Sequence, residues 1–145
     1  MTTHLDCMQA RKELNEKDDC TIRAAACALD LPYKEVHSLA AQHGRNHRDC
    51  MWPLFQKPDH RCSWPAMYNV ALNRTGKTVI NVTAWHKGRT IRTRLRQLNP
   101  NATYLILIHG HIFCYRQGEI LDQVTKLSLD KVIRVWMVVN RPKKV

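Results

Sequence analysis

The sequence predicts an α+β fold in which N-terminal helices pack on an antiparallel β-sheet. Apolar residues recur with helical spacing between residues 20 and 43, whereas short runs with the two-residue alternation of strands begin near Lys77. The pair Gln117–Gly118 separates two of these runs in the way that a hairpin turn does. Helices followed by a group of antiparallel strands are typical of an α+β domain.

Two helices are predicted in the first third of the chain. Asp18 and Asp19 are candidate N-caps for a helix over about residues 20–30, whose apolar face consists of Ala24, Cys27, Ala28 and Leu31. Cys20 precedes Ala24 by one helical repeat, so its thiol shares that face at the helix N-terminus. A second helix runs from Pro32 to His43 and stops at Gly44. Its inward stripe consists of Tyr33, Val36, Leu39, Ala40 and His43.

The other predicted elements complete one domain over residues 1–145. Residues 1–14 are interpreted as a lead-in segment and residues 141–145 as a basic tail. A long loop over residues 45–62 precedes a helix from Ser63 to about Asn73. The later elements are a strand over Thr78–Ala84, a helix over Thr90–Leu98, and strands over Tyr104–Ile108, His111–Tyr115, Glu119–Leu121 and Val132–Val139. We expect the strands to form an antiparallel meander.

Composition limits the classes to which the protein can belong. The chain of 145 residues fits one domain with a hydrophobic core, and its longest apolar runs are too short to span a membrane. Residues 1–12 contain no apolar signal region, so we expect a cytoplasmic protein. In that reducing compartment we expect no disulfides among Cys7, Cys20, Cys27, Cys50, Cys62 and Cys114. The formal net charge of +11 favours polyanions or acidic proteins as partners.

Three residues have the types and positions that cysteine catalysis needs. A thiolate is favoured at a helix N-terminus, where Cys20 is expected. An imidazole held by a third polar group must lie nearby to take the thiol proton. His111 opens one predicted strand and Asp122 ends the next, so a hairpin between them makes the two residues near cross-strand partners. The simpler interpretations are that Cys20 is a structural thiol, that His111 is a polar residue at a strand start and that Asp122 is a turn residue.

Two segments resemble a known family. The run NEKDDCTIRAAA at residues 15–26, with LPYKEVH at residues 31–37, is similar to the nucleophile helix of small papain-like proteins found in bacteria and phages. The run GHIFCYRQGEILD at residues 110–122 resembles the histidine strand, turn and aspartate strand of those proteins. This resemblance implies a papain-like cysteine peptidase fold, with Cys20 as nucleophile, His111 as base and Asp122 as the residue that orients His111. The implied reaction needs no cofactor or metal and attacks a peptide, isopeptide or related acyl carbonyl of a protein or peptide substrate.

The sequence departs from this family at two points. The family has an oxyanion-stabilising Gln shortly before the Cys, and the best matching amide here is Asn15, which would act beside the backbone N–H of Cys20. An Asn before a helix is also a common turn or cap residue. The pair Asp18–Asp19 puts two carboxylates beside the thiol, which oppose thiolate formation unless they turn outward as caps. A phage origin would place the protein in the cytoplasm of the host cell.

Two other patterns indicate different chemistry. Zinc-type ligands occur in the long loop at His47, Cys50, His60 and Cys62, but their spacing is not that of a recognised zinc motif. A run of cations without an intervening acid consists of Lys87, Arg89, Arg92, Arg94 and Arg96. This run is either a solvated surface or a docking site for nucleic acid or an acidic protein. The alternative function is therefore a catalytically silent papain-like scaffold that binds a host protein or nucleic acid.

Overall fold

The chain forms a layer of helices on an antiparallel sheet. Residues 1–17, 19–43, 45, 66–85, 89–108, 110–122 and 131–141 are described by a computed structural model. Their α-helices are α1 (His4–Glu13), α2 (Cys20–Leu29), α3 (Tyr33–Gln42), α4 (Ala66–Thr75) and α5 (Ile91–Leu95). Their strands are β1 (Lys77–Asn81), β2 (Thr103–Ile108), β3 (His111–Arg116), β4 (Glu119–Leu121) and β5 (Val132–Asn140).

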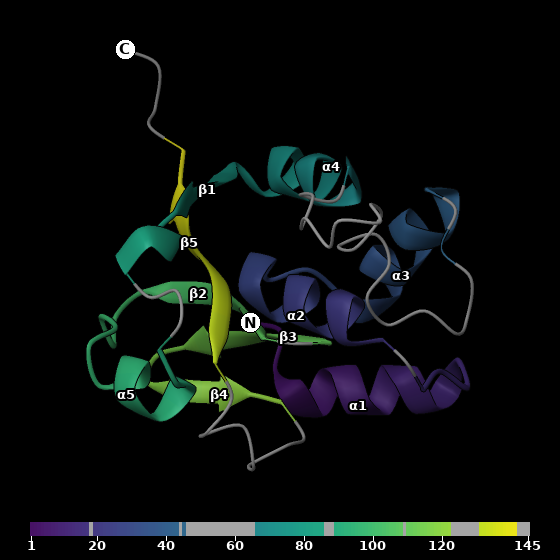
Figure 1. Cartoon of the computed structure of the whole chain (residues 1–145). Helices are drawn as coiled ribbons and strands as arrows, with labels where there is room; N and C mark the ends of the chain where they lie inside the picture. The colour runs from purple at the N-terminus through teal and green to yellow at the C-terminus, as the bar shows by residue number, and fades with distance from the viewer. Residues whose placement is uncertain are drawn as a thin grey trace, which may run out of the picture.

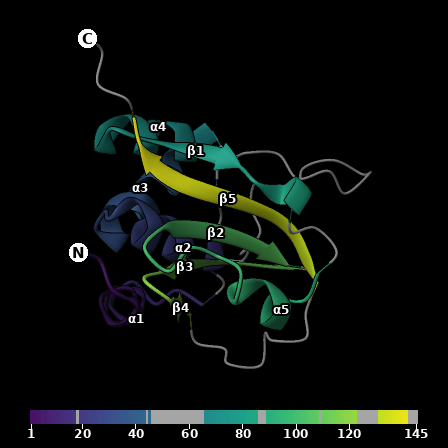
Figure 2. The ribbon, with the colours of Figure 1, turned by 90° about the vertical axis from the view of Figure 1, so that its left-hand side faces the viewer.

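Helices α1 to α4 lie on one face of the sheet, and α5 packs against the other face (Figures 1 and 2). The predicted α+β class, with N-terminal helices on an antiparallel sheet, is confirmed. In the part of the chain that the structure describes, no helix is long and apolar enough to cross a membrane.

The order of the strands is β1-β5-β2-β3-β4, and neighbouring strands are antiparallel. Strands β2, β3 and β4 follow one another as a meander, but β5 returns to pair with β2 and separates it from β1. The prediction of a meander of all the strands is therefore wrong. The physical reason lies in β2, which is buried from Tyr104 to Ile108 and needs a hydrogen-bonding partner along both edges.

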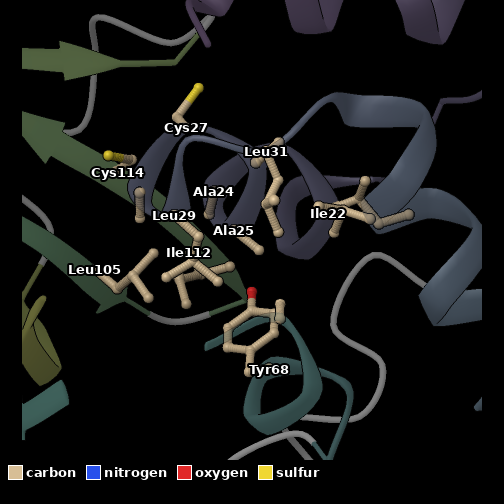
Figure 3. Close-up of a cluster of buried hydrophobic side chains, with 14 of the residues drawn as sticks. Ile22, Ala24, Ala25, Cys27, Leu29, Leu31, Tyr68, Leu105, Ile112 and Cys114 are labelled. Atoms are coloured by element: carbon tan, nitrogen blue, oxygen red, sulfur yellow. The ribbon is translucent and has the colours of Figure 1, made fainter. Parts of the chain in front are cut away.

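Helix α2 is the centre of the helical layer. The predicted helix is confirmed, but all ten of its residues are buried, so the expectation of a single apolar face is too narrow. Its alanines are strong helix formers and small enough for β3, α1, α3 and α4 to pack around the helix. Figure 3 shows Leu105 and Ile112 of the sheet beside Ala25 and Leu29, with the ring of Tyr68 closing the cluster from α4.

Residues 1–14 do more than lead into the domain. Thr3 and Asp6 form a reciprocal capping box that starts α1, a helix that the sequence analysis did not predict. The buried thiol of Cys7 on α1 lies 3.7 Å from that of Cys27 on α2. The Thr2 hydroxyl donates to the carbonyl of Leu31 at 2.8 Å, which ties the chain terminus to the end of α2.

The remaining elements differ from prediction mainly at their ends. Helix α3 has four of the five predicted inward residues buried, but His43, at its C-cap, is exposed. The first strand ends at Asn81 and a short 3-10 helix, Thr83–Trp85, replaces its predicted last residues. The predicted helix over Thr90–Leu98 is regular only as α5. The predicted long loop beyond Arg45, the start of the next helix at Ser63, the stop at Gly44 and most of the basic tail lie outside the described residues.

Candidate active site

Cys20 is the first residue of α2, and its exposed fraction is only 3%. The backbone N–H groups of a first helical turn have no acceptor within the helix, so they favour negative charge beside this thiol. Tyr68 of α4 lies against the same turn, because its hydroxyl donates to the carbonyl of Thr21 at 2.6 Å. Burial, followed by the fields of Cys20 and Cys114, raises the pKa of Tyr68, which therefore stays a neutral phenol.

His111 begins β3, and Asp122 follows the last residue of β4. The register pairs Cys114 with Leu121, so Asp122 comes opposite Phe113 and diagonally across from His111. The Nε2 atom of His111 and the Oδ2 atom of Asp122 form a hydrogen bond. With Asp122 as acceptor for Nε2–H, the lone pair of the imidazole is on Nδ1. The carboxylate is almost fully buried, whereas the imidazole is 21% exposed.

Cys20 and His111 occur at the same end of two elements that lie side by side. Helix α2 and strand β3 run in the same direction, since Arg116 near the end of β3 donates to the carbonyl of Cys27 at 2.7 Å. Figure 3 shows Ile112, nearer the start of β3, further toward the N-terminus of α2 than Cys114. In the same region, Arg23 of α2 contacts Asp122 at 2.9 Å. Along the helix axis, Cys20 is about 4.5 Å closer to the N-terminus of α2 than Arg23 is.

Asp19 occupies the N-cap position of α2 but does not act as an outward cap. Its side chain is fully buried and makes no capping hydrogen bond. Its carboxylate accepts from Arg23 at 2.9 Å and from the Tyr33 hydroxyl at 2.6 Å, and lies 3.3 Å from Arg11. The sequence left the orientation of this carboxylate open, and in the structure it turns inward, where two guanidinium groups compensate its charge. Asp18, the other predicted cap, lies outside the described residues.

Arg23 joins the start of α2 to the end of β4. Its Nε atom contacts Oδ1 of Asp19 and its Nη1 atom contacts Oδ1 of Asp122, each at 2.9 Å. The guanidinium is 7% exposed. Burial disfavours the charged form, but Asp19 and Asp122 outweigh that effect and raise the pKa of Arg23. Arg23 therefore remains charged while it bridges two carboxylates.

A second histidine, His4 of α1, is close to this group of charges. Its Nδ1 atom is buried and has no hydrogen-bond partner among the described residues. Burial is the main cause that lowers the pKa of His4, and the field of Arg23 adds to it, while Asp122 opposes the shift. His4 is therefore a neutral neighbour of the Arg23–Asp122 pair near physiological pH.

Asn15 adopts a left-handed backbone conformation in the turn that follows α1. The residue ends the turn after α1 with a φ of 53°, a conformation that Asn adopts more readily than most residues. Its side chain is exposed and makes no hydrogen bond to another described residue. Among the described residues, no contact is recorded between Asn15 and Cys20, His111 or Asp122, so the part of Asn15 in oxyanion binding stays a prediction.

The neighbour of Asn15 has a different environment. Glu16 is buried and accepts from Arg45 at 2.9 Å, and its carboxylate lies 2.8 Å from Nε2 of His37 on α3. These contacts fix the segment that leads into Cys20 to the neighbouring helix.

The other described thiols are buried within the apolar core. The thiols of Cys7, Cys27 and Cys114 are free, and their exposed fractions are 1% or less. Burial is the main cause that raises the pKa of Cys114. In Cys7 the hydrogen bond with Cys27 raises the pKa, and burial adds to it. These residues provide equally buried thiols with which Cys20 can be compared.

Neither a metal-binding cluster nor one of three surface hollows includes the described candidate residues. No group of three or more metal-binding side chains occurs within the described ranges, and the candidate zinc ligands His47, Cys50, His60 and Cys62 lie outside them. Three hollows on the described surface have volumes of about 430 to 570 Å³. They are lined mainly by α1 with its neighbours or by residues near the ends of β2 and β5, and Cys20, His111 and Asp122 line none of the three.

The basic run forms the surface around α5. Arg89, Arg92 and Arg96 are exposed, Arg94 is half-buried, and Lys87 lies outside the described residues. The backbone N–H of Val132 donates to the carbonyl of Arg89 at 2.7 Å, which ties this surface to the start of β5. Val132 pairs with Ile108, and Ile108 pairs with His111. The basic surface is thus at the end of the sheet where His111 stands.

Comparison of the chain with protein-family models, with curated proteins and with solved structures gives no match. The site therefore has to be interpreted from its own geometry. Sequence reasoning missed Arg23, His4 and the inward orientation of Asp19. One signal was present for Arg23, since it is the only charged residue in the run from Cys20 to Leu29 and stands one helical repeat after Asp19.

Proposed function

We propose that the protein is a cysteine-dependent hydrolase of the papain-like type. One observation carries the proposal: the buried carboxylate of Asp122 holds Nε2 of His111 at the end of the sheet that faces the N-terminus of α2, where Cys20 begins the helix. A nucleophile on a helix N-terminus and a base held by a third group are the parts that thiol catalysis requires. The substrate class is a protein or peptide, with cleavage at a peptide, isopeptide or related acyl carbonyl.

In the proposed reaction, Nδ1 of His111 takes the proton from Sγ of Cys20, and the thiolate attacks the carbonyl carbon. The carbonyl π electrons move to the oxygen, and backbone N–H groups at the start of α2 stabilise the resulting oxyanion, with Asn15 as a further donor. Collapse of this intermediate expels the amine, which takes the proton from His111. Water then attacks the thioester, and the carboxylic acid leaves while Cys20 regains its proton.

The first experiment measures the rate at which iodoacetamide alkylates each cysteine of the folded protein as a function of pH, by peptide mass spectrometry. We expect Cys20 to react near pH 6, well below the value of about 8.5 for a free thiol. His111→Ala removes the imidazolium that stabilises the thiolate, so this reactivity at low pH should disappear. The small reagent is necessary because Cys20 is only 3% exposed.

The internal controls are Cys7, Cys27 and Cys114, because their thiols are at least as buried as that of Cys20. A reagent reaches such buried thiols only when the fold opens. A Cys20 that reacts like an ordinary thiol, or no faster than these three, would show that no thiolate–imidazolium pair exists. A positive result justifies a search with internally quenched peptide libraries, in which Cys20→Ala should abolish hydrolysis.

A second candidate function is polyanion binding by the surface around α5. The exposed arginines of this surface are adjacent to the end of the sheet that carries His111, and the chain has a formal net charge of +11. Nucleic acid or an acidic protein would bind there through its charge. Under this alternative Cys20→Ala leaves binding unchanged, and affinity falls steeply with salt.

A further inference from the structure

We propose that Arg23 is a positioning residue of the site: its guanidinium fixes the carboxylate of Asp122 in the orientation in which Asp122 holds His111. The inference rests on the proposed function for its catalytic meaning, but its geometry can be tested without any substrate. Under this proposal α2 has two roles in the site: it places Cys20 at its N-terminus, and through Arg23 it orients Asp122.

The contacts form a continuous path from the start of α2 to the imidazole. Arg23 uses different nitrogens for its two partners, with Nε on Asp19 and Nη1 on Asp122. Asp122 in turn divides its two oxygens, because Oδ1 contacts Arg23 whereas Oδ2 contacts His111. An anchor on one oxygen fixes the plane of the carboxylate, and this plane decides whether the other oxygen points at Nε2 of His111.

Asp19 makes the anchor rigid. The fork of a guanidinium is planar, so a second contact through Nε removes its freedom to rotate about the side chain. Asp19 is itself held by Tyr33 at 2.6 Å and lies 3.3 Å from Arg11. A lysine at position 23 would present one ammonium group and could not reproduce this pair of fixed directions.

Several charged or titratable groups surround the pair and contribute to the field at His111. Asp19 is on the α2 side, His111 is on the sheet side, and His4 and Arg11 approach from α1. The two carboxylates are matched by the two guanidinium groups of Arg11 and Arg23. Arg23 has two possible routes to His111: its charge, and the orientation that it gives to the Asp122 carboxylate.

If Arg23 supplied only positive charge, Arg23→Gln would leave the Asp122 carboxylate oriented, and the His111 Nε2–H proton would stay protected from exchange. If Arg23 positions Asp122, the same change frees the carboxylate and weakens its hydrogen bond to His111, so Nε2–H exchanges faster, toward the rate in Asp122→Asn. The exchange rate of Nε2–H thus separates the two roles.

The experiment is proton–nitrogen NMR of protein with isotope-labelled histidine, which reports the exchange rate of the His111 Nε2–H proton. Arg23→Gln, Arg23→Lys and Asp122→Asn are compared with wild type. We expect Nε2–H to exchange at least about 10-fold faster in Arg23→Gln than in wild type, approaching the rate in Asp122→Asn. Alkylation of Cys20 by iodoacetamide near pH 6 should slow by a similar factor.

Arg116→Gln is the matched control, because Arg116 also bridges two groups at the other end of α2, the carbonyls of Cys27 and Thr2. It should leave both the His111 signal and Cys20 alkylation unchanged. A folded Arg23→Gln protein with wild-type exchange of the His111 Nε2–H proton overturns the proposal. Where Arg23→Gln does not fold, Arg23→Lys decides: faster Nε2–H exchange than in wild type supports positioning, and wild-type exchange overturns it.

The two readouts also keep this inference separate from the proposed function. The Nε2–H signal reports the contact between His111 and Asp122 and does not require a reactive Cys20, whereas alkylation reports the reactivity of Cys20 itself. Loss of the signal in Arg23→Gln, combined with a slow Cys20 in wild type, supports the positioning role and contradicts the hydrolase. A reactive wild-type Cys20 together with an unaffected His111 signal in Arg23→Gln supports the hydrolase and contradicts the positioning role.

Discussion

Three charged side chains that are almost fully buried, Asp19, Arg23 and Asp122, surround the start of α2. Burial of ions generally stabilises a protein little, because the desolvation of each ion offsets the attraction between them. Removal of one partner, however, leaves an unpaired buried charge and costs about 3–5 kcal/mol. The three contacts fix the position of the Asp122 carboxylate, and through it the position of His111.

His4 allows a prediction about pH at the same scale. Burial lowers the pKa of His4 below the value of 6.5 that it has in the unfolded chain. The unfolded chain therefore binds more protons as the pH falls below 6.5, and stability is lost as the pH passes down through the folded pKa. His4→Gln removes this contribution, so the free energy of unfolding should fall less between about pH 7.5 and pH 5 than it does in wild type.

Urea denaturation at several pH values, monitored by circular dichroism, measures this difference. His43→Gln is the control, because His43 is exposed at the C-cap of α3 and should leave the pH dependence as in wild type. An acid destabilisation of the same size in His4→Gln and wild type would show that His4 does not contribute to it.

At the scale of elements, the candidate site combines one local unit and one long-range contact. The hairpin of β3 and β4 brings His111 to Asp122 through a two-residue turn, in which Gln117 has a φ of 53° and Gly118 a φ of 78°. These positive values are those of a turn that twists with the strands. The register set by this turn decides which residue of β4 comes diagonally across from His111.

The turn leads to a prediction for the hairpin. Gly118→Ala forces a residue with a Cβ into the left-handed region, so we expect a loss of about 1 kcal/mol in the free energy of unfolding. Gln117→Asn, in contrast, introduces a residue that favours positive φ, and should stabilise the protein by a few tenths of a kcal/mol.

The two substitutions are compared by urea denaturation, and the His111 Nε2–H signal is recorded in each. Because no atom lies within 4 Å of a Cβ built at Gly118, steric clash cannot account for a loss of stability there. An unchanged stability in Gly118→Ala would mean that the turn relaxes to another conformation. A retained His111 signal in Gln117→Asn is expected, since the register does not change.

At the scale of the whole molecule, charge is distributed unevenly between interior and surface. The acids that occur inside the described structure, Glu16, Asp19 and Asp122, are paired with arginines, whereas the arginines around α5 are exposed. The excess of positive charge is therefore available at the surface near the end of the sheet that carries His111. An anionic group of a substrate or partner would be attracted to this side of the molecule.

Charge reversal tests this attraction. Arg92→Glu with Arg96→Glu lowers the formal net charge by four, from +11 to +7. Binding to a fluorescent DNA duplex should weaken, and the slope of log affinity against log salt should become shallower by about 2. Fluorescence anisotropy over a salt series measures both quantities.

Alkylation of Cys20 provides the control, and it should be unaffected because both arginines are remote in sequence and exposed on α5 or at its end. Equal salt dependence in the variant and wild type would mean that α5 is only a solvated surface. Binding that persists in Cys20→Ala but is lost in the charge-reversed variant would instead favour the polyanion-binding alternative.

Prediction from sequence succeeded where short-range physical rules decide the structure. Apolar periodicity located α2 and α3, and turn chemistry at Gln117–Gly118 located the hairpin and with it the contact between His111 and Asp122. The capped helix α1 was missed although Thr3 and Asp6 have the spacing of a capping box, because its residues lack a strong apolar stripe.

The sequence by itself determined the α+β class, the place of Cys20 at a helix start and the pairing of His111 with Asp122, since each depends on neighbours within about a dozen residues. Only the tertiary structure decided that β5 pairs with β2, that Asp19 turns inward and that Arg23 contacts Asp122, a residue 99 positions away. Such contacts depend on which surfaces pack together, and periodicity carries no information about a partner so distant in the chain.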